Sequence, residues 1–222
     1  MIYIFDKINL SETDFTGDVY SLLSEQRIQK VKRIQSHTGK KASIAVYLLL
    51  RLALYENYGI SEAVEFEYEY QMKPKLKNYP NIHFSLSHSN NTAACAIAES
   101  EIGVDVQQVR EVTDKVAARV LTKRELSAYY KSVNKAEYFC EIWTVKESYI
   151  KKTGDGLTFE LKKLYAANIK EIYTYKGHDY FCSICTQNNK QNNKQNLNEP
   201  QTRQIPEIKH IGRNDFEKLF GR

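Results

Sequence analysis

Three short strand patterns follow one another near the middle of the chain, and they constrain the fold more than any other part of the sequence. They lie at residues 82–89, 92–98 and 102–107. The pair Asn90-Asn91 is typical of a turn between the first two. The longest apolar stretch, residues 42–55, is too short to span a bilayer and predicts a buried core helix. Because strand and helix signals are mixed and do not alternate regularly, we predict the α+β fold class.

The third strand pattern carries two oxygen-bearing side chains on one face. Alternation along a strand directs Val104 and Val106 to one side and Asp105 and Gln107 to the other. A carboxylate and an amide placed in this way can share one cation. Magnesium suits such sparse protein ligation, because water and substrate phosphates complete its shell. Taken alone, an aspartate near a strand end is more often a turn former, so this pattern needs support from a second motif.

The second motif spans residues 143–151 and reads as one face of a helix. Trp143, Glu147 and Lys151 stand at i, i+4 and i+8, and Lys146 falls between them on the same side. A carboxylate binds a hard cation and lysines offset phosphate charge, so this face suits a site for a metal and a phosphate together. The ordinary alternative is a tryptophan packed in the core with solvated charges beside it.

The ends of this helix are marked in the sequence. Asn134 and Glu137 have the spacing of a capping box. Gly154 and Gly156 follow the last turn, where a residue with positive φ can end a helix.

Later in the chain, residues 169–175 and 178–186 predict a hairpin. Cys182 and Cys185 lie on its second strand, three residues apart, and therefore point to opposite faces. This arrangement disfavours chelation of a metal or a local disulfide, and we expect all four cysteines to be reduced and structural. Residues 187–204 repeat Gln-Asn-Asn-Lys and contain almost no apolar side chains, which predicts a flexible loop.

In combination the motifs are far more specific than any one of them. Ser-His-Ser at 87–89, Gly-Val-Asp-Val-Gln at 103–107 and the 143–151 motif resemble, in this order and spacing, the 4′-phosphopantetheinyl transferases of the surfactin-synthetase-activating type. Lys73-Pro74 precedes the first motif as it does in that family. The likeness covers roughly residues 1 to 186.

The resemblance implies an architecture and a reaction. The fold would consist of two pseudo-symmetric α+β lobes, residues 1–106 and 107–222, with the active site at their interface. The enzyme would use Mg²⁺ to transfer the phosphopantetheine arm of coenzyme A to a serine of an apo acyl or peptidyl carrier protein, releasing adenosine 3′,5′-bisphosphate. The resemblance also implies that the protein is a monomer.

Roles for individual residues follow from the same resemblance. Asp105, Gln107 and Glu147 would hold the metal, and Glu147, Lys151 and Asp105 would form the catalytic group. Glu147, or a water that it holds, would take the proton from the carrier serine. Trp143 would pack beneath the site. Contacts with coenzyme A are implied for a larger set: Arg27, Lys30, Lys41, Lys73, Pro74, Ser87, His88, Lys146 and Lys151.

Two departures from the family pattern motivate an alternative. Many members carry Glu at the position of Gln107, and the usual Arg at the start of the N-terminal core helix is Ala42 here, where Lys40 or Lys41 could substitute. A protein that binds coenzyme A but has little or no transferase activity would fit these changes. Retention of Asp105, Glu147 and Lys151 argues against it.

Charge and composition limit the other classes of function. A basic run after Ser24, with Arg27, Lys30 and Lys41 at near-helical spacing, would by itself also fit nucleic acid or a solvated face. A nucleic-acid-binding protein leaves both acidic motifs unexplained, so we expect no nucleic acid partner. The net charge of +5 is mild and favours acidic partners such as carrier proteins. With no basic signal segment before Asp6 and no apolar span, we expect a cytoplasmic protein that does not bind a membrane.

Overall fold

The computed structural model describes the chain except for residues 7, 9–17, 69–72, 157–159, 188–205 and 221–222. Its helices are α1 (Asp18–Ser21), α2 (Glu25–Arg33), α3 (His37–Tyr58), α4 (Asp114–Val120), α5 (Lys123–Lys131) and α6 (Lys135–Thr153). Short 3-10 helices follow as η3 (Leu161–Lys163), η4 (Ala166–Asn168) and η5 (Arg213–Phe220). The strands are β1 (Ile2–Phe5), β2 (Phe66–Glu67), β3 (Lys75–Leu76), β4 (His83–Ser89), β5 (Thr92–Ala98), β6 (Ile102–Gln108), β7 (Ile172–Lys176), β8 (Tyr180–Thr186) and β9 (Ile208–His210).

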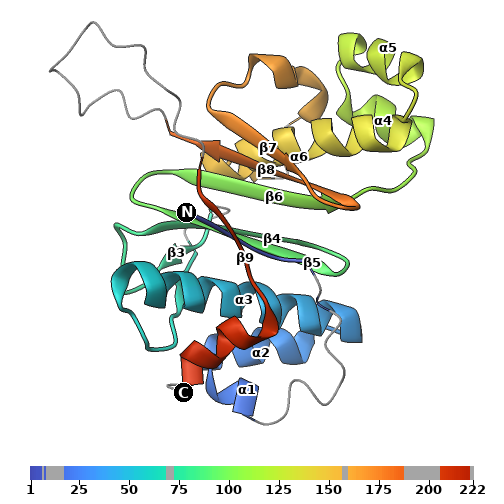
Figure 1. Cartoon of the computed structure of the whole chain (residues 1–222). Coiled ribbons are helices and arrows are strands. Elements are labelled where there is room, and N and C mark those ends of the chain that lie inside the picture. Colours follow the sequence, from blue (N-terminus) through green and yellow to red (C-terminus); the bar gives the residue numbers. More distant parts are fainter. Residues whose placement is uncertain (7, 9–17, 69–72, 157–159, 188–205, 221–222) are drawn as a thin grey trace, which may run out of the picture.

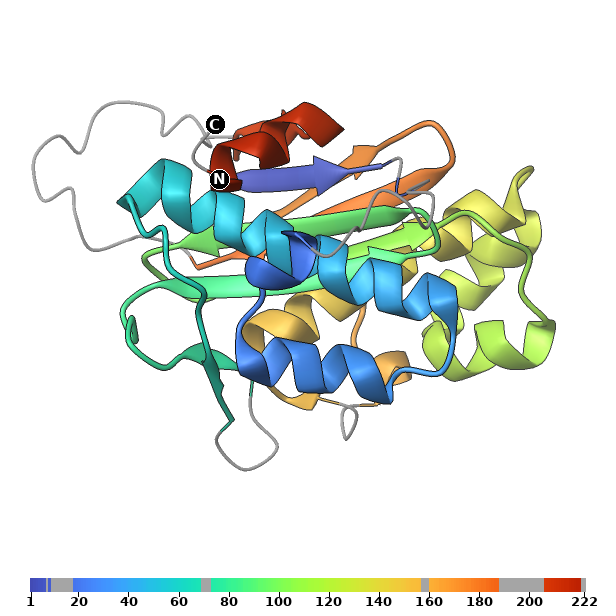
Figure 2. The same cartoon turned by 90° about the horizontal axis from the view of Figure 1, so that it is seen from below.

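Two sheets lie between two layers of helices (Figure 1). The first sheet has the strand order β4-β5-β1-β9, and the second has the order β6-β8-β7. Helix α3 covers the outer face of the first sheet, and α6 covers that of the second (Figures 1 and 2). The α+β fold class is confirmed.

The predicted strands and the core helix are present. The three strand patterns form β4, β5 and β6, and Asn90 turns the chain between the first two with a φ of 47°. Residues 42–55 lie within α3, whose side chains from Ala42 to Leu54 are all buried. The basic run falls on two helices, because α2 ends at Arg33 and α3 begins after its own cap, Ser36.

Apolar side chains form a core on each side of the first sheet. One cluster joins this sheet to α3 and includes Phe5, Leu49 and Phe84. A second cluster lies between the two sheets and includes Ile4 of β1 and Val104 of β6. Burial of these side chains on both faces holds the four layers together.

The predicted hairpin is confirmed as β7 and β8, with the first strand beginning at Ile172. Cys182 packs in the cluster between the sheets, and Cys185 packs on the opposite face beneath α6. All four cysteines are buried and free. This agrees with the expectation of reduced, structural thiols.

The topology departs from the expected division at residues 106 and 107. That boundary falls inside β6, which belongs wholly to the second sheet. The C-terminal strand β9 pairs in parallel with β1, so it joins the first sheet, and η5 packs against α3. Phe216 of η5 meets Phe5 edge to face with 5.4 Å between the ring centres. The C-terminal elements β9 and η5 therefore belong with the first sheet and α3.

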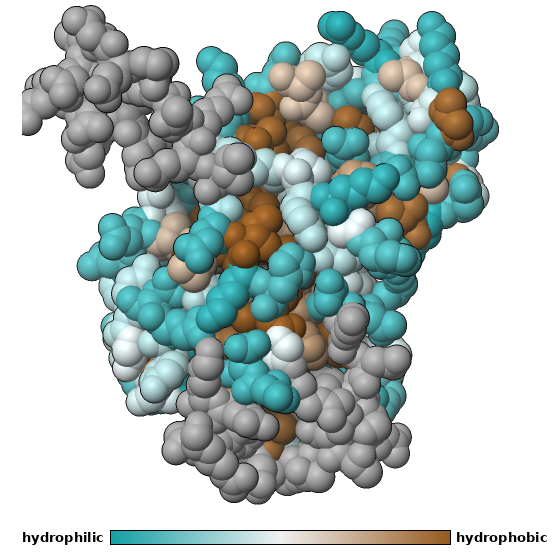
Figure 3. Space-filling model, viewed as in Figure 1, coloured by the Kyte–Doolittle hydropathy of each residue, from teal (hydrophilic) through white to brown (hydrophobic). Residues whose placement is uncertain are grey.

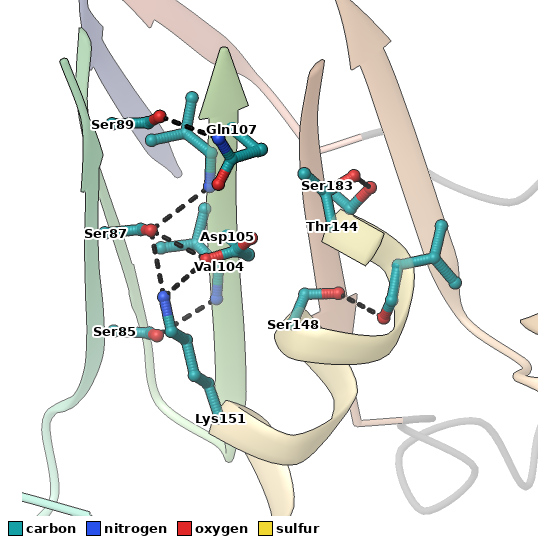
Figure 4. A network of polar contacts seen from close by, with 12 residues as sticks. Ser85, Ser87, Ser89, Val104, Asp105, Gln107, Thr144, Ser148, Lys151 and Ser183 are labelled. Atoms are coloured by element: carbon teal, nitrogen blue, oxygen red, sulfur yellow. Dashed lines mark hydrogen bonds and ion pairs between the residues drawn. The ribbon is translucent and has the colours of Figure 1, made fainter. Parts of the chain in front are cut away.

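Serine hydroxyl groups connect the facing edges of the two sheets. Strands β4 and β6 are both edge strands, and β6 therefore has backbone N–H groups without a strand partner. The hydroxyls of β4 accept from three of them: Ser85 from Val104 N at 3.0 Å, Ser87 from Val106 N at 3.2 Å and Ser89 from Gln108 N at 3.0 Å. We call these three contacts the serine ladder (Figure 4).

Helix α6 lies unusually close to β6 at Gly103. A Cβ atom at this position would be 2.5 Å from the backbone nitrogen of Lys152 and closer still to the carbonyl oxygen of Ser148. Only glycine permits this approach, which places the side chains of α6 against the acidic strand.

The ends of α6 agree with the sequence. The side chain of Asn134 accepts a hydrogen bond from Glu137 N at 3.1 Å, and Gly154 ends the helix with a φ of 81°. The full reciprocal capping box occurs instead on α5, between Thr122 and Glu125.

Two further expectations concern the Asn/Gln-rich segment and membrane-spanning helices. Apart from Gln187, the Asn/Gln-rich segment 187–204 lies outside the described residues. Within the described part of the chain, no helix has both the length and the apolar character to cross a bilayer.

Candidate functional site

A cavity of about 770 Å³ lies between the elements packed around the first sheet and helix α6, which covers the second sheet. Helices α2 and α3 and strand β4 form one side, and α6 with the segment after it forms the other. Among the residues expected to act in function, this cavity is lined by Arg27, Lys30, Lys73, Pro74, His88, Glu147 and Lys151. The structure thus brings together residues that are far apart in the sequence.

Arg27 is a buried cation on the α2 wall. Only 5% of its surface is exposed, and its Nη1 donates to Ser43 Oγ at 3.2 Å. Its guanidinium lies 4.8 Å from the ring centre of Tyr47 and 5.2 Å from that of Phe66. No carboxylate among the described residues forms an ion pair with it. A buried guanidinium held in this way is suited to bind an anionic ligand.

Two further basic side chains, Lys30 and His88, line the same side of the cavity. Burial and the neighbouring Arg27 lower the pKa of Lys30. Burial, Lys151 and Lys30 lower the pKa of His88, which favours the neutral imidazole. An anion bound beside Arg27 and Lys30 would offset the repulsion between these two cations.

Asp105, Ser87 and Lys151 form a closed hydrogen-bonded group at the edge of the cavity (Figure 4). Lys151 Nζ lies 2.6 Å from Asp105 Oδ1 and 2.9 Å from Ser87 Oγ. The Ser87 hydroxyl donates to the same Asp105 oxygen at 2.8 Å. The other oxygen, Asp105 Oδ2, is buried and has no hydrogen-bond partner. An unpaired buried carboxylate oxygen is costly unless a cation or another donor meets it.

Glu147 lies on the cavity wall one turn before Lys151. Burial raises the pKa of its carboxyl group, the negative charge of Asp105 raises it further, and Lys151 opposes the change. A cation bound beside Glu147 and Asp105 would offset the negative charge that raises the pKa of Glu147. In the part of the chain that the structure describes, no three His, Cys, Asp or Glu side chains are grouped to bind a metal by themselves. The donor set of two acids fits Mg²⁺, which takes its remaining ligands from water and phosphate.

Gln107 lies two residues after Asp105 on β6, and its amide nitrogen already makes two hydrogen bonds. Its Nε2 donates to Ser89 Oγ at 3.1 Å and to the carbonyl oxygen of Gln108 at 3.2 Å. The amide is thereby oriented, and its carbonyl oxygen is the atom that could ligate a metal.

Lys73 is positioned by contacts outside the cavity. Its Nζ lies 3.0 Å from Glu101 Oε2 and also donates to the carbonyl oxygen of Ile102 at the start of β6. Pro74 lines the cavity beside it. The Lys73-Pro74 segment is therefore fixed to the second sheet across the opening.

Three expected contacts with coenzyme A are not supported by the geometry. Lys146 is fully buried, and its ammonium group is directed to Glu125 and two carbonyl oxygens. Ser87 directs its hydroxyl to β6 and Lys151, because side chains alternate along β4 and His88 takes the side facing the cavity. Lys41 is on α3 but is not among the described residues that line the cavity.

Other lining residues were not expected from the sequence. Phe66 and Ser43 contact Arg27, and Leu161 lines the wall after α6. Trp143, which was expected to pack beneath the site, both lines the cavity and packs against Phe139, with 5.9 Å between the ring centres. Phe66 lies in a two-residue strand with little local signal, so only its long-range packing identifies it.

Comparisons with known proteins agree on one family. A family model described as the 4′-phosphopantetheinyl transferase superfamily matches residues 101–204. The 4′-phosphopantetheinyl transferase ffp of Bacillus subtilis is 30% identical over 164 residues, which are 72% of this chain and 71% of that protein. The 4′-phosphopantetheinyl transferase Sfp of Bacillus subtilis (strain 168) is 26% identical over 144 residues, 64% of each chain.

A cyanobacterial protein and a solved structure give further matches. The 4′-phosphopantetheinyl transferase HetI of Nostoc is 32% identical over 149 residues, 63% of each chain. The Thermotoga maritima holo-[acyl-carrier-protein] synthase aligns with a TM-score of 0.28 and 16% identity over 38% of this chain and 60% of that one. This last alignment is too partial to describe the fold.

Proposed function

The chain belongs to the 4′-phosphopantetheinyl transferase superfamily, and we propose that it transfers the 4′-phosphopantetheine group of coenzyme A to a serine of an apo acyl or peptidyl carrier protein. The second product would be adenosine 3′,5′-bisphosphate. The observation that carries the proposal is the cavity itself, in which Glu147 and Lys151 stand on one wall, Lys151 bonded to Asp105 behind it, and Arg27 and Lys30 stand on the other.

The two walls suit the two parts of the reaction. Arg27 and Lys30 would bind the ribose 3′-phosphate of coenzyme A, since the cavity offers them no carboxylate partner among the described residues. Lys151 would offset the charge of the pyrophosphate, and its present contact with Asp105 Oδ1 keeps it beside the acids. Pro74 and His88 would border the nucleotide.

Asp105 and Glu147 would hold Mg²⁺, with the carbonyl oxygen of Gln107 as a further ligand. When bound, the metal would neutralise the pyrophosphate and stabilise the leaving group. Glu147 would accept the proton of the carrier serine, directly or through water, because burial and Asp105 make it a stronger base than an ordinary glutamate.

A protein that only binds coenzyme A is the less favoured alternative, since the similar curated proteins are named as transferases. We further propose that the enzyme is monomeric and cytoplasmic and that it requires neither nucleic acid nor a membrane.

The intact mass of carrier proteins tests the proposal directly. The protein is incubated with coenzyme A, Mg²⁺ and a panel of apo carrier proteins, and each carrier is followed by mass spectrometry. A Mg²⁺-dependent gain of one phosphopantetheine group on any carrier is expected. Measurable binding of coenzyme A without a gain on any carrier would favour the alternative.

Arg27 gives a prediction about coenzyme A that is independent of the carrier. Arg27→Gln is expected to weaken binding of coenzyme A by roughly 10–100-fold, the value of one lost charge-assisted hydrogen bond. Binding is measured by calorimetry, and the melting temperature shows whether the variant is folded.

Coenzyme A without its 3′-phosphate is the matched ligand. The wild type should bind it more weakly than coenzyme A, and this difference should be smaller in Arg27→Gln, where Lys30 alone remains to meet the 3′-phosphate. If the variant loses affinity for both ligands equally, Arg27 does not contact the 3′-phosphate.

A further inference from the structure

A buried ion pair that the proposed reaction does not use lies behind the catalytic helix. Lys146 Nζ is 2.6 Å from Glu125 Oε2, and the two side chains are 0% and 2% exposed. Burying two charges has a large desolvation cost, and apolar replacements of such pairs often leave a protein equally stable or more stable. Stability alone therefore explains this pair poorly.

The pair connects four separate segments of the chain. Lys146 belongs to α6 and also donates to the carbonyl oxygens of Val120, in the last turn of α4, at 2.8 Å and of Leu161 at 3.2 Å. Glu125, near the start of α5, accepts from Thr122 N at 2.8 Å and from Ala166 N at 2.8 Å. Burial alone would raise the pKa of Glu125, but its hydrogen bonds, that from Lys146 first, lower the pKa below its usual value. The carboxylate is therefore ionised.

These segments border the proposed active site. Leu161 lines the cavity, and Glu147 is the next residue after Lys146. Leu161 and Trp143 both pack against the apolar cluster formed with α4 and α5. Hydrogen bonds are directional, whereas apolar contacts in that cluster permit small displacements. The pair is thus the feature that fixes the backbone of these segments in one arrangement.

We propose that Glu125 and Lys146 are positioning residues for the transferase reaction. They fix α4, α5 and residues 161–166 against α6, and so hold the Leu161 wall of the cavity in place beside Glu147. Neither residue contacts the reacting atoms in this arrangement. The inference rests on the proposed function only for its effect on the rate.

Replacing both members of the pair separates positioning from stability. Lys146→Met and Glu125→Leu alone each leave a buried charge without its partner and should lower the melting temperature. The double variant leaves none, and its melting temperature should return toward that of the wild type. Its kcat should still be lowered by roughly 10–100-fold, as expected for a small displacement of a catalytic group. Its KM for coenzyme A should stay close to that of the wild type.

A second measurement does not depend on transfer. Trp143 is the single tryptophan of the chain and, like Leu161, packs against this cluster and lines the cavity. Its emission and its quenching by acrylamide should therefore change in the folded double variant. If the double variant does not fold, Glu125→Gln is measured instead, because it keeps the shape of the side chain but leaves only one oxygen to accept from Lys146, Thr122 N and Ala166 N.

The exposed pair Lys176–Glu137 is the matched control. It joins β7 to the same helix at 2.6 Å, with side chains 54% and 35% exposed. Lys176→Met with Glu137→Gln should change neither kcat nor the emission of Trp143. Wild-type kcat and emission in the folded variants of the buried pair would overturn the proposal. Failure of the proposed function would appear differently, as a wild type that modifies no carrier.

Discussion

Glu147→Gln is expected to abolish transfer and, in metal-free buffer at neutral pH, to raise the melting temperature. The rate should fall by roughly 10²–10⁴-fold, because the variant loses both a metal ligand and the base for the carrier serine. Stability should rise because burial and the negative charge of Asp105 both disfavour the ionised carboxylate of Glu147 in the folded protein. Transfer is measured by carrier mass, and stability by thermal unfolding.

The pH dependence of the stability gain follows from the sign of the shift. A carboxyl group whose pKa is raised in the folded state binds its proton more tightly there than in the unfolded chain. Ionisation therefore lowers stability as the pH rises above the usual carboxyl range through the raised pKa. The advantage of Glu147→Gln should shrink as the pH falls through that pKa, and vanish where Glu147 is protonated in both states.

Glu141→Gln is the matched control, since Glu141 is exposed on the same helix. It should change neither the rate nor the melting temperature appreciably. Transfer by Glu147→Gln at the wild-type rate would show that this carboxylate has neither proposed role.

Gly103→Ala is expected to cause a large loss of stability. The added Cβ would meet backbone atoms of Ser148 and Lys152, which no side-chain rotation can relieve. Overpacking typically costs about 1–3 kcal/mol, and a clash with helix backbone should reach or exceed the upper value. Since α6 carries Glu147 and Lys151, the displaced helix should also lose transfer. Urea unfolding gives the change in free energy.

Gly59→Ala separates the clash from a general effect of glycine. Gly59 has a φ of 68° and no atom within 4 Å of its would-be Cβ, so the change has only the cost of a left-handed backbone, roughly 1–2 kcal/mol. Transfer should persist in that variant. Equal destabilisation by the two substitutions would contradict the close approach at Gly103.

Local patterns predicted the elements well because their causes are local. Short strand-like stretches and the Asn90-Asn91 turn identified β4 to β6, and the caps at Asn134 and Gly154 identified the ends of α6. The resemblance that the motifs carried, and not their spacing alone, predicted a common site for Asp105, Glu147 and Lys151, and the family that the motifs indicated is confirmed.

The partners of individual side chains were harder to predict, because they depend on distant segments. Alternation places Ser87 on one face of β4, but only the second sheet determines that this face meets β6. Lys146 precedes Glu147, and consecutive helix residues point about 100° apart. Its partner Glu125 lies on another helix. The parallel pairing of β9 with β1 joins opposite ends of the sequence and has no local signal.

The side chains on the face drawn in Figure 3 are mainly hydrophilic, with apolar ones in separate patches. The view covers both sheets' layers and shows no broad apolar band across the described residues. An acidic carrier protein that approached this face would therefore be recognised chiefly through polar and charged groups.

The serine ladder offers a residue-resolved probe of the contact between the two sheets. A hydroxyl can release its partner by rotating about one bond, so Val104, Val106 and Gln108 can lose their acceptors while both sheets stay intact. Hydrogen exchange at these three amides should therefore be faster than at neighbouring amides bonded to β8. A ligand that bridges Arg27 and Lys151 would slow exchange at all three amides together. Solution NMR could thus follow the effect of a ligand on the contact between the two sheets without any label at the active site.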